Sequence, residues 1–484
     1  MEPRESRRVN RFELTPEPCS NGPFAGYWGL DRINSAARRN PDTQFAALLH
    51  HLSPGNLRQA FRQLDGSKAV GIDQVTKQDY QKNLDENLAR LADEVGRGGW
   101  RPKPAREVLI PKASGGTRPL AIGCLEDKLV QSLCGKVLEA IYEDSFHRHS
   151  YGFRPKRNPH QALARLYSVV HERQETCVVV EMDIEKFFNS VNHERLIEIL
   201  SKRIEDGHFL RLIRRMLRNS VLSEDGEIRT TERGTPQGAP ISPILANIYL
   251  HFCLDTWFDE NWAAHGQMVR YADDAVFVFT SADQAAEFKE QLKTRLQEFG
   301  NLALNEDKSG ILKFDSRKPE GELPFLGFQL YWGKAGQRGK PQLKVKTAPK
   351  KLANAMAQFS DWIKADRCRK KLDDLWDLAA AKLRGHYSYY GVSFNQPKLS
   401  HFYFACTQAL FKWLNRRSQK RSFTWERFLR RLMFKPLPLP TPGAQLIDIT
   451  RGLVTGSKHQ TRSRMRKSRT YGSKRSPGLS PVFT

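Results

Sequence analysis

The sequence of 484 residues predicts an α+β fold, and two observations support this prediction. Short apolar runs typical of buried strands surround acidic residues at 178–183 and 268–279. After about residue 332 the apolar residues change to the spacing of amphipathic helices, at 350–359, 372–383 and 406–414. We therefore expect a strand-containing body followed by a helical region.

The N-terminal segment differs from the rest in composition. Residues 1–42 are polar and basic and contain Pro and Gly, so we expect a flexible or loosely packed extension. Helical spacing at 44–52 and 57–64 predicts that helices follow it. The expected divisions are the extension at 1–42, the body at 43–332, the helical region at 333–432, and a proline-rich linker with a basic region at 433–484.

A β-hairpin is predicted around residue 114. The segments 110–112 and 117–120 bracket a Gly-containing turn and carry one cation on each arm, Lys112 and Arg118. A guanidinium fork and an ammonium point charge both suit phosphate oxygens. Solvated hairpin charges are the other interpretation of this pattern, because exposed Lys and Arg are common.

Acidic side chains end the predicted strands of the body. Asp273 and Asp274 stand at the tip of a predicted hairpin, and Asp183 follows the apolar run from Val178. Carboxylates at strand ends of one sheet suit divalent metal ions, as two-metal phosphoryl transfer requires. Taken alone, an Asp pair more often decorates a turn or caps a helix than binds metal, and Asp183 could cap a helix.

Further motifs occur in a fixed order around these carboxylates. The sequence Arg-Gly-Thr-Pro-Gln-Gly at 233–238 precedes the Asp pair, and the segments 305–308 and 325–328 follow it. With these motifs the chain closely resembles the reverse transcriptases encoded by bacterial group II introns, from about residue 71 to at least 391. The resemblance implies a right-hand polymerase with fingers, an antiparallel-sheet palm and an α-helical thumb, plus a short basic C-terminal region.

The resemblance also implies a metal site. Asp183 and Asp273 match the side-chain ligands of two Mg²⁺ ions, for which Mn²⁺ could substitute, and the backbone carbonyl of Ile184 matches a further ligand. Asp274 matches the second acidic residue of the hairpin. Such ions activate the primer 3′-hydroxyl and neutralise charge on the α-phosphate, while the protein supplies position and field.

Six residues match positions that bind the incoming nucleotide in this family. Phe188 matches a steric gate under the sugar, which implies dNTP as the substrate, whereas we expect Phe187 to be core. Lys308 matches a cation that can protonate the departing pyrophosphate, although an exposed turn lysine is the alternative. The six are Lys112, Arg118, Phe188, Gln237, Gly238 and Lys308.

Other matched residues would hold nucleic acid. Phe325, Leu326 and Gly327 match the primer grip. Arg154, in the Ser-Tyr-Gly-Phe-Arg-Pro signature at 150–155, could touch the template or buttress the palm. Arg384 begins an aromatic signature at 384–391, whose rings we expect to be core rather than stacked on bases.

The charge of the chain favours a nucleic-acid partner. Lys and Arg number 78 against 53 Asp and Glu, a formal net charge of +25. After residue 443 there is one acid, Asp448, and the basic tail resembles a short DNA-binding region, although a solvated tail is the general alternative. The sequence leaves open whether the tail meets RNA or DNA. Its candidate residues are Arg462, Arg464, Arg466, Lys467 and Arg469.

Several features expected of other protein classes are missing. We find no apolar run long enough to span a bilayer and no signal-peptide core, so we expect a bacterial cytoplasmic protein, nucleoid-associated on DNA. Seven scattered cysteines predict neither a zinc site nor disulfides. The zinc-supported His-Asn-His nuclease of many intron proteins is missing, so target DNA would need another primer source, such as a nascent strand at a replication fork.

We therefore predict an RNA-directed DNA polymerase that also binds intron RNA as a maturase. Its partners would be an RNA template, a DNA primer or target, and dNTPs. The alternatives are a non-mobile relative recruited to phage defence or DNA repair, and a splicing-only maturase that has lost polymerisation. The retained Asp183, Asp273 and Asp274 argue against the second. RNA-dependent RNA polymerases usually carry glycine where this chain has Ala272. The oligomeric state, the intron and the target stay open.

Overall fold

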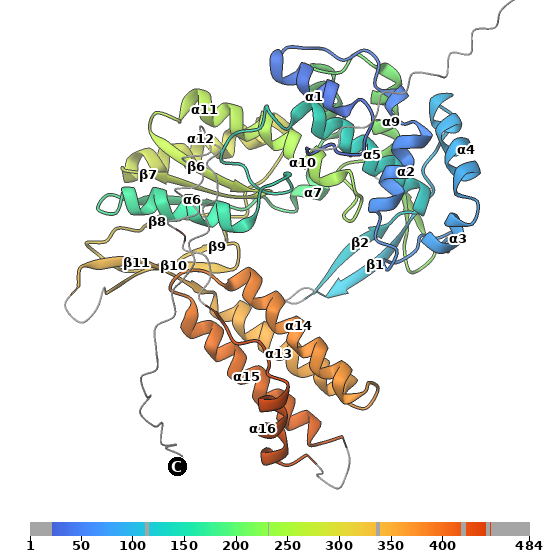
Figure 1. The fold of residues 1–484 in the computed structure, drawn as a ribbon. Helices are drawn as coiled ribbons and strands as arrows, with labels where there is room; N and C mark the ends of the chain where they lie inside the picture. The colour runs from blue at the N-terminus through green and yellow to red at the C-terminus, as the bar shows by residue number, and fades with distance from the viewer. Residues whose placement is uncertain are drawn as a thin grey trace, which may run out of the picture.

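The structure is a computed structural model that describes residues 22–111, 116–230, 232–334, 339–417, 423–441 and 446. Figure 1 shows three parts: helices with a long β-hairpin on the right, a sheet with its helices on the left, and a bundle of helices below. These parts are the fingers, the palm and the thumb, and the chain returns from the palm to the fingers at residues 193–230.

The fingers combine helices with a four-stranded sheet in the order β2-β1-β4-β5. β1 and β2 form the predicted antiparallel hairpin, in which Pro111 faces Thr117, and β4 joins β1 in parallel. The elements are α1 (Leu30–Arg39), the 3₁₀ turn η1 (Leu49–His51), α2 (Pro54–Gln63), α3 (Lys77–Gln81), α4 (Leu84–Gly96), β1 (Ala105–Pro111), β2 (Thr117–Ile122), α5 (Leu125–Tyr142), α8 (His193–Ser201), α9 (Gly207–Leu217), β4 (Ser220–Leu222) and β5 (Ile228–Thr230).

The palm is built on a second four-stranded sheet, in the order β6-β7-β3-β8, in which all neighbours are antiparallel. Its apolar strands are buried on both faces, because Val178 and Phe277 belong to the core shared with the fingers, whereas Val179 and Val278 pack on the opposite side. The elements are α6 (Pro159–Glu172), β3 (Val178–Met182), α7 (Phe187–Ser190), α10 (Ser242–Leu250), the π-helical turn η2 (His251–Asp255), α11 (Thr256–Asn261), β6 (Gly266–Tyr271), β7 (Asp274–Phe279), α12 (Ala282–Gly300) and β8 (Ile311–Lys313).

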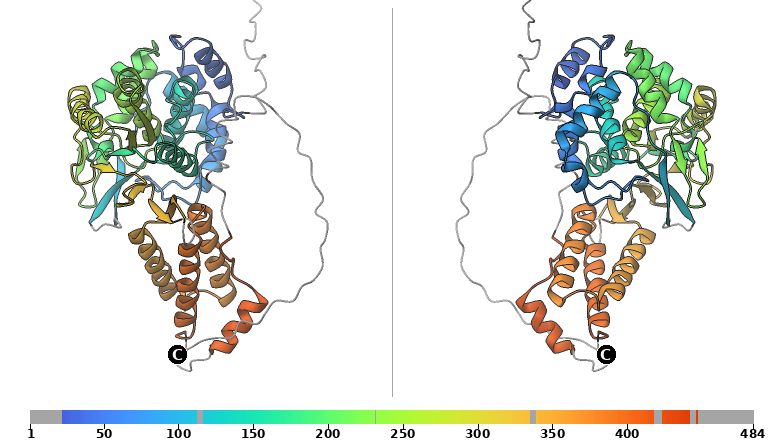
Figure 2. Two further views of the ribbon diagram at one scale, coloured as in Figure 1. Left: turned by 90° about the vertical axis from the view of Figure 1, so that its left-hand side faces the viewer. Right: turned by 90° about the vertical axis from the view of Figure 1, so that its right-hand side faces the viewer.

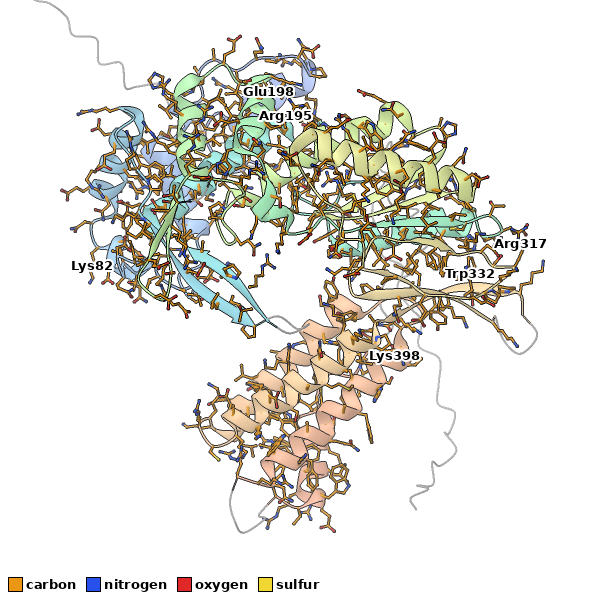
Figure 3. All side chains as sticks on the ribbon, turned by 180° about the vertical axis from the view of Figure 1, so that it is seen from behind. Lys82, Arg195, Glu198, Arg317, Trp332 and Lys398 are labelled. Atoms are coloured by element: carbon orange, nitrogen blue, oxygen red, sulfur yellow. The ribbon has the colours of Figure 1, made fainter. Side chains whose placement is uncertain are left out.

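A three-stranded sheet in the order β11-β10-β9 connects the palm to the thumb. Trp332 on β10, labelled in Figure 3, is buried against Phe314 and donates from Nε1 to its carbonyl at 3.2 Å. The thumb helices form a bundle with its own core, seen from two sides in Figure 2. The elements are β9 (Leu323–Phe325), β10 (Phe328–Lys334), β11 (Pro341–Thr347), α13 (Pro349–Asp366), α14 (Leu372–Tyr390), α15 (Gln396–Leu414) and α16 (Trp425–Phe434).

Three expectations about the boundaries were wrong. The chain is folded from residue 22 onward, with Phe24, Tyr27 and α1 packed into the fingers core, so the loosely packed extension does not reach residue 42. The segment 44–52 is mostly not helical, because the amides of Leu48 and Leu49 donate to the Asp206 carboxylate and not to a helical ladder. Strands also continue past residue 332 to Thr347, so the helical part begins at Pro349.

The described helices include none that is long and apolar enough to cross a lipid bilayer. Figure 3 shows charged side chains such as Lys82 on the fingers and Lys398 on the thumb extending from the surface.

Candidate active site

The palm sheet brings the three predicted carboxylates to one edge. Met182 pairs with Ala275, and Tyr271 pairs with Asp274 across the β6–β7 turn. Asp183 therefore leaves β3 beside the position where Asp274 begins β7, and Asp273 lies in the turn between β6 and β7. The structure thus places these side chains at strand ends of one sheet, as the apolar pattern predicted.

The turn that carries Asp273 has a constrained backbone. Ala272 has a φ of +58°, in the left-handed region where glycine is the usual residue. It is buried against Gly152, where an added Cβ would lie 2.3 Å from the Ala272 nitrogen. Tyr151 N donates to the Arg270 carbonyl, so the Tyr151-Gly152 segment runs beside the turn. The Tyr-Gly motif therefore supplies a close backbone contact behind the carboxylates.

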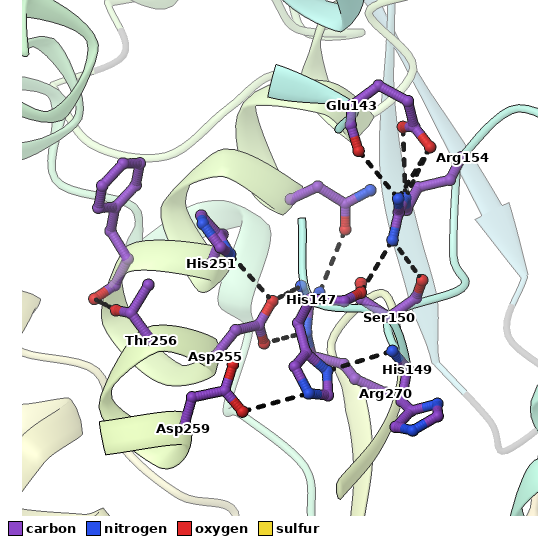
Figure 4. A network of polar contacts seen from close by, with 12 residues as sticks. Glu143, His147, His149, Ser150, Arg154, His251, Asp255, Thr256, Asp259 and Arg270 are labelled. Carbon is purple, nitrogen blue, oxygen red and sulfur yellow. Dashed lines mark hydrogen bonds and ion pairs between the residues drawn. The ribbon is translucent and has the colours of Figure 1, made fainter. Parts of the chain in front are cut away.

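A buried ion pair also supports the turn (Figure 4). Arg270 donates to both carboxylate oxygens of Asp255, at 2.8 and 2.5 Å, and both residues are 0% exposed. Nη1 of Arg270 donates to the Ala272 carbonyl at 2.9 Å and to Asn247 Oδ1 at 3.2 Å. Asp255 belongs to the π-helical turn η2, a type of irregularity that is frequent at functional sites. Arg270 thus links this turn to the catalytic hairpin.

The pKa values of Asp273 and Asp274 are raised by burial and by neighbouring carboxylates. Burial and then the charge of nearby Asp183 raise the pKa of Asp273. Burial, followed by the charges of Asp273 and Asp183, raises the pKa of Asp274 to about 6, although this residue keeps solvent access at the sheet edge. Lys308 Nζ lies 2.9 Å from Asp183 Oδ2, to which Asn305 Nδ2 also donates at 3.1 Å. This ion pair offsets part of the negative charge.

The donor set suits Mg²⁺, which prefers carboxylate and carbonyl oxygens. The mutual repulsion of the carboxylates favours binding of a cation between them. In the β-bridge between Ile184 and Leu304, the hydrogen bonds are made by the Asp183 carbonyl and the Glu185 amide. The Ile184 carbonyl takes no part in these two bonds and stays available as a metal ligand. Within the described ranges, no three acidic, His or Cys side chains converge on one point closely enough to hold an ion. The type and charge of the donors thus fit a divalent metal ion, although they are not gathered into a preformed cluster.

The fingers hairpin approaches the palm through Gln237. Arg118 Nε donates to Gln237 Oε1 at 2.6 Å, and Gln237 Nε2 donates to Asn189 Oδ1 at 3.2 Å. Gly238 has a φ of +104°, and an added Cβ there would lie 2.9 Å from the Ala121 carbonyl. Three predicted nucleotide-binding residues, Arg118, Gln237 and Gly238, are thus brought together. Lys112 lies outside the described residues.

The two adjacent phenylalanines have different environments. Phe187 is 2% exposed and packs in the core against Tyr249, which confirms the expectation that it is a core residue. Phe188 is only half-buried, and its carbonyl accepts from Thr235 N at 2.6 Å. The steric-gate role of Phe188 stays a prediction.

A cavity of about 840 Å³ lies beside the carboxylates. Asp183, Asp274 and Lys308 line one part of it, and the predicted primer grip lines another. In that hairpin Phe325 pairs with Phe328, and Leu326 and Gly327 have φ values of +51° and +80°, as in a type I′ turn.

The thumb contacts the primer-grip hairpin through the aromatic signature. Tyr389 Oη donates to the Leu326 carbonyl at 3.0 Å, and its ring stacks on Phe328. His386 stacks on Phe402 inside the thumb, and the ring of Tyr390 also packs on Phe328. These rings pack on other protein rings, but they are not fully buried, and Tyr389 is exposed, so the expectation that they are core is met only in part.

Sequence reasoning missed several residues of the cavity. Glu181 lies two residues before Asp183, hence on the same face of β3, and burial raises its pKa to about 7. Lys350 and Lys351, in the first turn of α13, also line the cavity. A glutamate within an apolar strand, at period-two spacing from Asp183, was the available signal for Glu181.

The assignment of Arg154 to nucleic-acid binding was wrong. The side chain is buried, donates to the Glu143 carboxylate at 2.9 Å, and donates to the carbonyls of His147 and Ser150 (Figure 4). With its donors spent on protein acceptors, Arg154 buttresses the palm. Arg384 is exposed on α14 and stays a prediction. The tail residues Arg462, Arg464, Arg466, Lys467 and Arg469 lie outside the described residues.

The fold and site together define a polymerase of the right-hand class: a palm sheet with carboxylates at its edge, a fingers hairpin and a helical thumb. Residues 110–330 match the family described as reverse transcriptase (RNA-dependent DNA polymerase). Protein YkfC of Escherichia coli is 32% identical over 362 residues, which are 67% of this chain and 93% of YkfC. The chain belongs to the reverse transcriptase family.

Relatives encoded by introns also match. The group II intron-encoded protein LtrA of Lactococcus lactis is 33% identical over 224 residues, 46% of this chain and 37% of LtrA. An uncharacterized 91 kDa protein in a cob intron of Schizosaccharomyces pombe is 48% identical over 149 residues, 31% of this chain and 18% of that protein. The resemblance to intron-encoded reverse transcriptases is thereby confirmed, although the matches span less than half of these two proteins.

Proposed function

We propose that this enzyme extends a DNA primer on an RNA template with dNTPs, using divalent metal ions held by Asp183, Asp273 and the Ile184 carbonyl. The observation that carries the proposal is the placement of Asp183, Asp273 and Asp274 at strand ends along one edge of the palm sheet, beside a cavity that the predicted primer-grip hairpin also lines. Ions bound there would activate the primer 3′-hydroxyl and neutralise charge on the α-phosphate.

The protein residues supply position and charge around this reaction. Arg118, held by Gln237, presents a guanidinium from the fingers for the triphosphate. Lys308 donates a hydrogen bond to Asp183, which raises the pKa of the lysine. Lys308 therefore stays a cation at neutral pH, beside the position proposed for the leaving pyrophosphate. The Leu326-Gly327 turn holds the primer end against the carboxylates, because both line the same cavity.

We further propose that the enzyme binds group II intron RNA as a maturase. The similarity to LtrA, named as a group II intron-encoded protein, supports this role, and so does the net charge of +25. A splicing-only maturase is the alternative that the incorporation assay tests.

The test is dNTP incorporation on an annealed RNA template and DNA primer with Mg²⁺. We expect Asp273→Asn to abolish incorporation, whereas Asp283→Asn, in the first turn of α12, should leave it unchanged. Both variants should unfold at the same temperature as the parent. An RNA-binding parent protein that incorporates no dNTP would overturn the polymerase proposal and favour the splicing-only candidate.

A further inference from the structure

We propose that a pocket on the fingers, between the end of α4 and helix α9, binds backbone phosphate of a structured RNA at a site separate from the polymerase cavity. The inference rests on the proposed function only in that RNA is the partner. The pocket has a volume of about 210 Å³. Its lining residues are Leu49, Val95, Arg97, Gly98, Trp100, His208, Arg211, Leu212 and Arg215.

The backbone between α4 and β1 holds the guanidinium of Arg215, which lines the pocket, and that of Arg101, which binds the same carbonyls beside it. Arg215 Nη1 donates to the Gly98 carbonyl at 2.8 Å and to the Trp100 carbonyl at 3.3 Å. Arg101 Nη1 donates to the same two carbonyls, at 2.9 and 3.0 Å, and to that of Gly99. Each guanidinium is anchored through one nitrogen in these bonds, and the acceptors are neutral. None of these bonds pairs either guanidinium with a carboxylate.

Positive charge accumulates on this side of α9. Burial, then the charges of Arg101 and Arg211, lower the pKa of Arg215, as expected for cations that face one another. Arg97 pairs with Asp93 at 2.8 Å, the one carboxylate contact among the described pocket arginines.

The other side of the same helix is compensated. Arg214 and Arg218 both pair with Glu194, at 2.8 and 3.0 Å. The neighbouring helix α8 carries a further pair, Arg195 with Glu198, labelled in Figure 3. Arg211 and Arg215 of the pocket have no such carboxylate contact among the described residues, whereas Arg214 and Arg218 share Glu194.

The chemistry of the pocket favours a phosphate group. Guanidinium forks match phosphate oxygens in pairs, and phosphate is the anion that RNA presents repeatedly along its backbone. A volume of about 210 Å³ is smaller than typical ligand pockets, which suits a single phosphate group and not a whole nucleotide.

The position of the pocket separates it from the reaction. It shares no lining residue with the cavity beside the carboxylates. Figure 1 places α4 and α9 at the end of the molecule opposite to β6 and β7. The RNA segment bound at this pocket is therefore not the segment that serves as template at the carboxylates.

The test compares two double variants that each remove two charges. Arg101→Gln with Arg211→Gln removes two positive charges at and beside the pocket, and Arg214→Gln with Arg218→Gln removes two from the neighbouring side of α9. Binding of a structured intron-type RNA of several helices is measured as a function of salt, and dNTP incorporation is measured on a short primer–template. Thermal unfolding checks that both variants fold.

We expect the pocket variant to lose about tenfold in RNA affinity and to reduce the salt slope by about one, with incorporation on the short primer–template unchanged. The control variant should lose less than about twofold. Equal losses of RNA affinity in both variants would mean that only net charge matters. A loss of short-template incorporation in the pocket variant would mean that the pocket belongs to the polymerase machinery. Either result overturns the proposal. Because the readout is RNA binding, it stays decisive even if the parent protein incorporates no dNTP.

Discussion

Replacing Arg270 with Met tests whether the buried pair behind the catalytic turn sets its geometry. The substitution leaves Asp255 buried without its partner, and removing one member of a buried pair costs about 3–5 kcal/mol. It also removes the donor that lies 2.9 Å from the Ala272 carbonyl, next to Asp273. We therefore expect a lower free energy of unfolding in urea and a higher Mg²⁺ concentration for half-maximal dNTP incorporation.

A second variant separates stability from geometry. Combining Arg270→Met with Asp255→Leu replaces both charges by apolar side chains, which is often neutral for stability. The Ala272 carbonyl still lacks its donor in this variant. If one lost hydrogen bond weakens metal binding by about 1.4 kcal/mol, half-saturation by Mg²⁺ should rise about tenfold. Binding of Mn²⁺ to the protein alone, followed by electron paramagnetic resonance, should show the same weakening without reference to activity.

The matched control is the pair of Arg154 with Glu143, which is also largely buried but whose hydrogen bonds go to residues 143, 147 and 150 and not to the β6–β7 turn. Arg154→Met combined with Glu143→Leu should keep the metal requirement of the parent. If the Arg270 double variant is stable and also keeps the parent's metal requirement, Arg270 serves only the core and the reasoning is refuted.

Three further predictions follow from single contacts. Gly152→Ala places a Cβ 2.3 Å from the Ala272 nitrogen and should lower incorporation by about tenfold or more. The control Gly135→Ala, whose Cβ would have its nearest neighbour atom at 3.8 Å, should not lower it. Equal activities of the two variants would show that the Gly152 contact does not support the site. Phe188→Ala should admit ribonucleotides in a dNTP/rNTP competition assay, while Phe187→Ala should instead lower the free energy of unfolding by about 3–5 kcal/mol. Burial raises the pKa of Asp127 to about 7, so its charged form opposes folding, and this loss of stability grows as the pH rises from about 4 through 7. Asp127→Asn should therefore stabilise the protein at pH 8 and have little effect at pH 4, and a pH-independent effect in thermal unfolding would contradict this.

The sequence was sufficient to predict the carboxylate edge, because strand ends and antiparallel pairing are local patterns. An apolar run followed by Asp183 and a hairpin tipped by Asp273 and Asp274 leave few ways to pair two such strands. The fingers hairpin was predictable for the same reason, since its turn residues lie between two short extended segments.

Long-range packing was not predictable from these patterns. Arg154 and Arg270 are both arginines beside family motifs, and only the tertiary structure shows that each is buried on a carboxylate, Glu143 or Asp255. The segment 44–52 has helical spacing, but the Asp206 carboxylate, distant in sequence, accepts from its amides and decides its backbone. Period-two spacing places Glu181 on the same face as Asp183, but its burial comes from the surrounding elements and could not be predicted from that spacing.

The hydrogen bond from Tyr389 to the Leu326 carbonyl gives the thumb a mechanical role. The hairpin that faces the primer end and the helix α14 are joined at this point, together with the stacking of Tyr389 on Phe328. As a growing duplex advances by one base pair, a shift of α14 would pull Leu326 with it. We therefore expect the proposed grip on the primer end to follow the thumb's hold on the product duplex.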